Sequence, residues 1–338
     1  MFIIGVDPHR GSHVAVVLDD HEQIQDQLTV TANRLQQQRL LDWGSRFEPH
    51  VWAIEGASGT GALLAQQLVA AGERVLDVPP ALAARVRLLD NEQRSKTDRH
   101  DARSVAVAAR RKRGLRAVAP EDHIAVLRLL AKRHHELVAG RTRAVCRLHS
   151  TLCYLAEGHF PKRLRADQAA SILSRIHASN EIARHRKAVA REHLAEVRRF
   201  DSALAELDTR IRTAVTASGS SVTAVHGVGP IMAAYLIGYT GDIGRFPSAG
   251  HFARYNGTAP IDASSGTHIR HRLNPDGNRQ LNHALYVAAL GQISHDTPGR
   301  DYYLRKQAEG HTRKEALRAL KRRISDAIYR QMLTDARR

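Results

Sequence analysis

The chain has 338 residues, of which 51 are Lys or Arg and 34 are Asp or Glu, giving a formal net charge of +17 at pH 7. A chain of this length is expected to form two or three domains, and so large a positive surplus indicates a strongly anionic partner, most commonly nucleic acid. Two cysteines exclude a disulfide framework, and no apolar run reaches the roughly 18 residues that a transmembrane helix needs.

The N-terminus has a short apolar run before the first acidic residue. Residues 2–6 are apolar and Asp7 ends the run, which is too short for the apolar region of a signal peptide. We therefore expect a cytoplasmic protein that contacts no membrane.

Residues 1–118 alternate between short apolar runs and amphipathic segments. Strands are predicted at 2–7, 13–20, 27–30, 51–57 and 74–79, and helices at 33–47, 59–71 and 81–113. Three strands therefore come first, and helix, strand, helix, strand and helix follow. This order is that of the ribonuclease-H-like fold, so we predict an α/β domain with a mixed sheet over residues 1–118.

Residues 119–216 are predicted to form a helical domain with a coiled coil. Glycine is rare there, and the second half has apolar residues at heptad spacing. One heptad position holds Ala190, Val197, Leu204 and Ile211, and the other holds His193, Phe200, Leu207 and Ala214. The pattern fits an antiparallel hairpin within one chain as well as a dimerising coiled coil.

The rest of the chain is predicted to be mostly helical. Residues 217–300 are glycine-rich and compact, with a helix expected over 279–293 after the turn at 274–277. Residues 301–338 are predicted to form a basic helical tail. The basic runs at 110–113 and 321–323 are either contacts for backbone phosphate or solvated helix faces.

Four acidic residues form the most informative pattern of the first domain. Asp7 ends the first strand and Glu55 ends the fourth, and these two strands lie side by side and parallel in the predicted fold. Asp98 and Asp101 are three residues apart on a helix and so share one face. If that helix closes over the sheet edge, the carboxylates converge and Mg²⁺ or Mn²⁺ is the natural cation to neutralise them. Taken singly, each acid is more often structural.

Two further sets of residues are predicted to contact nucleic-acid phosphates. Cations flank the second acid pair in the sequence: Arg94, Lys96, Arg99 and Arg103. Gly227 and Gly229 precede a helix whose free backbone amides can hold a phosphate, although a simple packing turn explains the two glycines equally well.

A serine in the C-terminal half is a candidate nucleophile. Ser264, Ser265 and Gly266 precede the cations Arg270 and Arg272. A serine hydroxyl beside cations can attack a DNA phosphate and form a covalent phosphoserine link. From these residues alone, an ordinary turn is the more frequent meaning of Ser-Ser-Gly.

Motifs from both halves of the chain resemble those of one transposase family. The first domain contains GVDPHR (5–10), AIEGASGT (53–60) and KTDRHDAR (96–103), and the C-terminal block contains GVGP (227–230) and RFPSAGHFARYNGTAP (245–260) before the Ser-Gly pair. Together they resemble the DEDD motif and C-terminal block of the insertion-sequence transposases related to the Piv DNA invertase, insertion sequence family one hundred and ten. The resemblance extends over about residues 3–295.

The resemblance implies a RuvC-like nuclease domain, a coiled-coil middle and a C-terminal transposase domain. It implies a recombinase that excises and inserts its own element, acts on double-stranded donor and target DNA, and in some members is guided by a bridge RNA. Two element ends and two strands require at least a dimer, so we expect a homo-oligomer, a dimer or a tetramer. By the same resemblance, the metal-binding acids are Asp7, Glu55, Asp98 and Asp101, and the nucleophile is Ser265, which reverses the interpretation as a turn.

Other functions fit parts of the same pattern. A RuvC-like nuclease or junction resolvase would use the metal site to activate water and would not need the serine. A non-enzymatic RNA- or DNA-binding protein would need only the positive charge, and its acids would be structural. A sugar-kinase-like ATPase shares the sheet order, but the sequence has no clear glycine-rich phosphate loop after the first strand.

Overall fold

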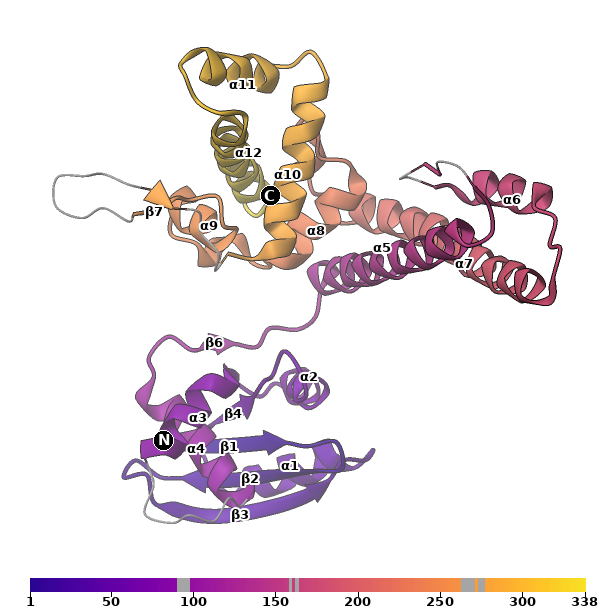
Figure 1. Cartoon of the computed structure of the whole chain (residues 1–338). Coiled ribbons are helices and arrows are strands. Elements are labelled where there is room, and N and C mark those ends of the chain that lie inside the picture. The colour runs from indigo at the N-terminus through magenta and orange to yellow at the C-terminus, as the bar shows by residue number, and fades with distance from the viewer. Residues whose placement is uncertain (90–97, 158–159, 162–163, 263–270, 273–276) are drawn as a thin grey trace. The chain divides into compact units, whose positions relative to one another are not determined.

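The chain forms two compact units, Met1–Glu121 and Asp122–Arg338 (Figure 1). The structure is a computed structural model and describes the whole chain except residues 90–97, 158–159, 162–163, 263–270 and 273–276. The division falls just before the long helix that begins at His123.

The first unit is built on one mixed sheet with the strand order β3-β2-β1-β4-β5-β6. Strands β1, β2 and β3 are antiparallel, β1, β4 and β5 are parallel, and β6 is antiparallel to β5. This is the order and direction of the ribonuclease-H-like sheet, as predicted, with the short β6 added at the edge. The strands are β1 (Phe2–Pro8), β2 (Ser12–Leu18), β3 (Ile24–Thr31), β4 (His50–Glu55), β5 (Val75–Val78) and β6 (Arg116–Ala117).

Helices cover both faces of this sheet because its central strands are apolar on both sides. On one face, Ile4, Trp52 and Ile54 are buried in a cluster with residues of α1 (Gln36–Gly44) and α2 (Ala62–Ala70). On the other face, Ile3 and Ala53 pack against α4 (Asp98–Arg111). The remaining helix of the unit is α3 (Pro80–Leu89). The predicted helix at 33–47 is shorter in the structure.

Gly5 determines how closely α4 lies on β1. A Cβ atom at Gly5 would stand 2.3 Å from the carbonyl oxygen of Ala102 and 2.6 Å from the amide nitrogen of Ala106. Only glycine therefore allows the backbone of α4 to rest directly on this strand. The contact fixes the first turn of α4 beside the end of β1.

The second unit begins with two long helices, α5 (His123–Cys153) and α7 (Glu181–Ala217), which pack antiparallel within one chain (Figure 1). Polar contacts follow the antiparallel register: Arg147 forms an ion pair with Glu196, Arg141 forms one with Asp201, and His134 lies 3.7 Å from Asp208. Most of the predicted heptad residues are buried or half-buried in the seam, so the hairpin is the arrangement found in the chain. Helix α6 (Ala166–Arg175) packs against α7 through Leu173.

The remainder of the second unit is a helical cluster whose core lies between α8, α10 and α12. Residues 301–338, predicted as a basic tail, include α12, whose Leu320, Ile324 and Ile328 are buried in this core. The elements are η1 (Val222–Ala224), α8 (Pro230–Thr240), η2 (Ile243–Arg245), α9 (Ala249–Tyr255), β7 (Ile261–Asp262), β8 (His271–Arg272), α10 (Arg279–Ser294), α11 (Pro298–Ala308) and α12 (Arg313–Asp335). Among the described helices, none is both long and apolar enough to cross a membrane.

Candidate active site

Asp7 and Glu55 lie at the carboxyl ends of neighbouring parallel strands. Residue Val6 of β1 is paired with Ile54 of β4, so the next residue on each strand falls at the same edge of the sheet. Both carboxylates are largely buried, with side-chain exposures of 10% for Asp7 and 14% for Glu55. The predicted meeting of the two strand ends is therefore present.

Helix α4 supplies the other two acids from its first turn. Asp98 is the first residue of the helix and Asp101 lies one turn later. The side chain of Asp101 is only 6% exposed, whereas that of Asp98 is 63% exposed. Carboxylates are favoured at a helix N-terminus because they face the positive end of the helix dipole. The Asp101 carboxylate is thus held firmly, and the Asp98 carboxylate has room to move.

The side chains of His9 and Arg87 lie between the four acids. His9 Nε2 is 3.2 Å from Asp7 Oδ2 and 3.7 Å from Asp98 Oδ1. Arg87 Nη1 is 2.9 Å from Asp101 Oδ1 and 3.9 Å from Glu55 Oε2. These contacts show that the four acids occupy one neighbourhood, which we call the acid cluster.

Neither His9 nor Arg87 was predicted from the sequence as part of this site. His9 is two residues after Asp7, and the period of two in an extended segment puts both on one side, so this neighbour could have been found. Arg87 lies in the last turn of α3, where the sequence has no motif that distinguishes it from other arginines.

The carboxylates of Asp7 and Glu55 are partly removed from water and are repelled by neighbouring acids. Burial, and to a smaller extent repulsion from Asp101 and Asp98, raises the pKa of Asp7 although His9 and Arg87 act in the opposite direction. Burial and the charge of Asp7 likewise raise the pKa of Glu55, against the effect of Arg87. A bound cation would relieve this repulsion.

The acid cluster fits a divalent metal ion in its chemistry, but its side chains are not arranged around one. Carboxylate oxygens are the ligands that Mg²⁺ and Mn²⁺ prefer. Across the described residues, however, no three His, Cys, Asp or Glu side chains are grouped so that they could hold a metal ion. His9 and Arg87 are the side chains that lie between these acids in the described part of the chain.

In the sequence, the predicted nucleophile lies between β7 and β8, two short antiparallel strands, and we call the segment 257–277 the serine hairpin. In β7 and β8, Ile261 pairs with Arg272 and Asp262 with His271. At the base of the hairpin, Gly257 has φ +74° and a Cβ on Gly277 would lie 2.4 Å from the Cα of Gly257, so the two backbones touch. Outside the described residues lie Ser264, Ser265, Gly266 and Arg270, and likewise Arg94 and Lys96 of the first unit.

The other residues predicted to contact phosphate differ in how exposed they are. Arg99 is exposed on α4, whereas Arg103 is half-buried and its charge helps to lower the pKa of Glu22. Gly229 is exposed at the start of α8. Gly227 has φ +83°, and a Cβ there would lie 2.4 Å from the Ala288 carbonyl oxygen, so packing against α10 already requires glycine.

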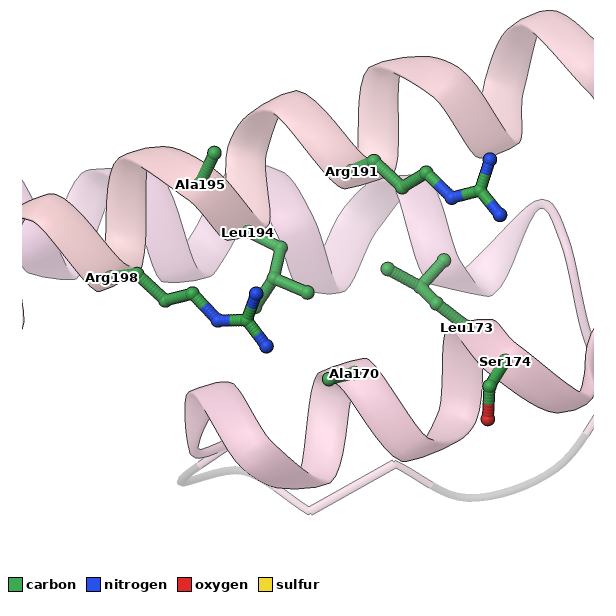
Figure 2. A pocket seen from close by; sticks show the side chains of 7 residues that line it. All are labelled: Ala170, Leu173, Ser174, Arg191, Leu194, Ala195 and Arg198. Atoms are coloured by element: carbon green, nitrogen blue, oxygen red, sulfur yellow. The ribbon is translucent and has the colours of Figure 1, made fainter.

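A cavity of about 460 Å³ lies between α6 and α7 (Figure 2). Arg191 and Arg198 extend from α7 beside Leu194, and Leu173 points toward them from α6, where Ser174 also lines the cavity. Both arginines are exposed and seven residues apart, so they occupy the same side of the helix two turns apart. Because two arginines line it, the cavity is a candidate binding site for an anion.

Comparison with known proteins settles the family. A family model described as "Transposase", for the DEDD proteins of IS110, matches residues 4–156, and the model "Transposase IS116/IS110/IS902 family" matches residues 220–304. The chain belongs to the IS110 family of DEDD transposases. The resemblance drawn from the motifs is therefore confirmed, and with it the class of enzyme, a transposase that cleaves DNA.

Relatives in the IS110 family match almost the whole chain. The 44.8 kDa protein of IS116 from Streptomyces clavuligerus is 25% identical, covering 99% of this chain and 95% of the relative. The 42 kDa protein of IS900 from Mycobacterium paratuberculosis is 29% identical, covering 98% and 95%. The 43.6 kDa protein of IS110 from Streptomyces coelicolor is 40% identical over a shorter part, 34% of this chain and 28% of the relative.

Solved structures of RuvC also match part of the chain. RuvC from T. thermophilus in complex with a Holliday junction substrate is 16% identical, with a TM-score of 0.29, covering 35% of this chain and 99% of RuvC. The Thermus thermophilus RuvC structure is 17% identical, with a TM-score of 0.28, covering 35% and 100%.

Proposed function

We propose that this transposase excises and inserts its element by cleaving DNA strands and exchanging them through a phosphoserine intermediate. The observation that carries the proposal is the acid cluster, in which two strands and a helix from distant parts of the first unit bring four carboxylates together. Ser265 provides the nucleophile from the second unit. Two element ends and two strands call for a homo-oligomer, a dimer or a tetramer.

The acid cluster is the proposed metal site. Asp7, Glu55, Asp98 and Asp101 would hold Mg²⁺ or Mn²⁺, which when bound polarises the scissile phosphate and stabilises the charge that develops on it. The strands fix Asp7 and Glu55, while the exposed Asp98 side chain can adjust to the ligand. Arg87, once displaced from the carboxylates, keeps a positive charge next to the incoming phosphate.

The proposed chemistry conserves the phosphodiester bond. The Ser265 hydroxyl loses its proton, its Oγ forms a bond to phosphorus, and the P–O bond to the leaving strand breaks, so that strand ends in a hydroxyl that takes up a proton. The hydroxyl end of another strand then attacks the phosphoserine, joins to phosphorus and returns the serine hydroxyl. No nucleotide cofactor is required, because the number of phosphodiester bonds is unchanged.

The proposed substrates are double-stranded donor and target DNA, selected by pairing with a bridge RNA. The positive charge of the chain and the small aromatic share, 5% of residues, support contacts with phosphates more than stacking on bases. We assign backbone contacts to the predicted set of Arg94, Lys96, Arg99, Arg103, Gly227, Gly229, Arg270 and Arg272.

A strand-transfer reaction with purified protein, bridge RNA, donor DNA, target DNA and Mg²⁺ tests the proposal. We expect Asp7→Ala and Ser265→Ala each to lower strand transfer at least about 1,000-fold, because each removes a part of the reacting site. Ser264→Ala, next to the proposed nucleophile, is the matched control and should retain most activity. Full activity of Ser265→Ala, with free ends produced by hydrolysis, would instead support a RuvC-like nuclease.

A further inference from the structure

A strongly basic cavity lies in the second unit beside the base of the serine hairpin. It has a volume of about 550 Å³ and is bounded on one side by the backbone of residues 257–260 and on the other by α11 and α12. The cationic side chains that line it are Lys306, Arg318, Lys321, Arg322 and Arg323, and His311 and the cavity's one lining acid, Glu315, lie beside them. We call this the hairpin-base cavity.

In the described part of the chain, Glu315 is the one carboxylate that lines the cavity with these cations. Glu315 accepts hydrogen bonds from the amide and hydroxyl of Thr312, at 2.8 and 2.7 Å, and these bonds, with a smaller contribution from the charge of Arg318, lower its pKa. Lys306 and Arg322 have their own partners outside the cavity lining, Glu309 and Asp326. In the described part of the chain, ion pairs to carboxylates are absent at Arg318, Lys321 and Arg323.

Lys321 is the best-placed of these cations because the fold holds its ammonium group in position. Lys321 Nζ donates to Asn282 Oδ1 at 2.6 Å, which uses one of the three ammonium donors. Asn282 in turn donates through Nδ2 to the carbonyl oxygens of Asn256 and Gly257, at 3.0 and 3.1 Å. This chain of hydrogen bonds connects α12 through α10 to the base of the serine hairpin.

Among the described residues, no carboxylate forms an ion pair with Lys321. Burial lowers the pKa of Lys321 to about 8, because its ammonium is partly removed from water without a carboxylate beside it. A bound anion in the cavity would use the remaining donors and supply the missing negative charge.

We propose that the hairpin-base cavity binds a phosphodiester of the DNA strand on which the transposase acts, with Lys321 as its anchor. The proposal rests on the proposed function, because DNA is favoured over other anions by the hairpin, whose base forms a wall of the cavity and whose sequence contains Ser265. The phosphate would be held by Lys321 and Arg318, and the hydrogen bonds through Asn282 would fix its position relative to Gly257.

The contact should be independent of base sequence. The one aromatic side chain lining the cavity, Tyr302, already lies under the guanidinium of Arg323, at 4.5 Å from the ring centroid. Its face is therefore not free for a nucleobase to stack. Binding through phosphate alone predicts a strong salt dependence and no preference among duplexes of different sequence.

The test measures duplex DNA binding by the full-length chain as a function of salt. Lys321→Met keeps the aliphatic stem and removes the charge, and we expect it to weaken binding about tenfold and to reduce the salt slope by about one. Lys321→Arg should restore most of the affinity. Lys132→Met, an equal charge loss on the exposed side of α5, should change affinity less than about twofold.

A pH series adds a second readout. Charged and titratable groups from three segments line the cavity with Lys321: Glu315, Arg318, Arg322 and Arg323 of α12, Tyr302 and Lys306 of α11, and His311 between these helices. In addition, the ring centroid of Tyr286 of α10 lies 6.0 Å from Lys321 Nζ. The Lys321 contact requires the protonated amine, so wild-type affinity should fall as pH rises above about 8. That fall should be smaller in Lys321→Arg.

The outcomes separate this proposal from the proposed function. Unchanged DNA affinity and salt slope in Lys321→Met, at an unchanged melting temperature, would overturn the proposal. If that variant unfolds, Arg318→Met on the exposed surface takes its place, with the same expected direction. A larger loss with an RNA duplex than with DNA would reassign the cavity to the guide. Binding does not require cleavage, so Ser265→Ala should bind DNA with the affinity of the wild type. This expectation is the same whether or not the reaction passes through a phosphoserine.

Discussion

At the scale of single residues, Arg87 lies close to two acids of the acid cluster. Its guanidinium contacts Asp101 and approaches Glu55, so it competes with a metal ion for the same carboxylates. Arg87→Met should therefore bind Mn²⁺ about tenfold more tightly than the wild type, as measured by calorimetric titration. In the absence of metal, the variant should melt at a lower temperature, because Asp101 loses its partner in a buried position.

Arg87→Lys is the matched control for this prediction, since it keeps the charge and should bind Mn²⁺ nearly as weakly as the wild type. Equal or weaker Mn²⁺ binding by Arg87→Met would show that Arg87 does not occupy the cation position.

The residues of the acid cluster were only partly predictable. The ends of two apolar strands and a spacing of three on a helix were enough to bring Asp7, Glu55 and Asp101 together, since the fold dictates where such positions meet. The placement of Arg87 depends on how α3 leaves the sheet, which is a matter of tertiary packing that no local pattern encodes.

At the scale of elements, the contact between β1 and α4 decides whether the acids meet. Gly5→Ala would place a methyl group 2.3 Å from the Ala102 carbonyl and push α4 away from the strand. We expect a loss of about 1–3 kcal/mol in the free energy of unfolding, measured by urea denaturation, and weaker metal binding because Asp101 moves with α4. Gly11→Ala meets no atom within 4 Å and is the control. Equal stability of the two variants would contradict this account of the contact.

The strand order was predictable because each central strand is a continuous apolar run with a clear end. Strand β6 was missed, since Arg116–Ala117 is short and polar and is defined only by its pairing with β5. The heptad pattern predicted a helix seam, but the partner of α7 became evident only from its register with α5. In the predicted basic tail, Leu320, Ile324 and Ile328 at spacing four do indicate a buried face, which the surrounding charge obscured.

At the scale of the whole molecule, the proposed reaction needs both units. The acid cluster belongs to Met1–Glu121, and the serine hairpin and its basic cavity belong to Asp122–Arg338. Neither unit alone contains both the proposed metal ligands and the proposed nucleophile. The proposal therefore predicts a covalent link between DNA and Ser265 of the second unit. It also predicts that this link forms only when the acids of the first unit are present.

The most direct measurement is therefore a search for protein attached to DNA during strand exchange, with the attachment site located by mass spectrometry. The account predicts that wild-type protein with Mg²⁺ forms an adduct on Ser265, and that Asp7→Ala and Ser265→Ala form none. Efficient cutting of the DNA with no adduct, or with an adduct on another residue, would contradict it.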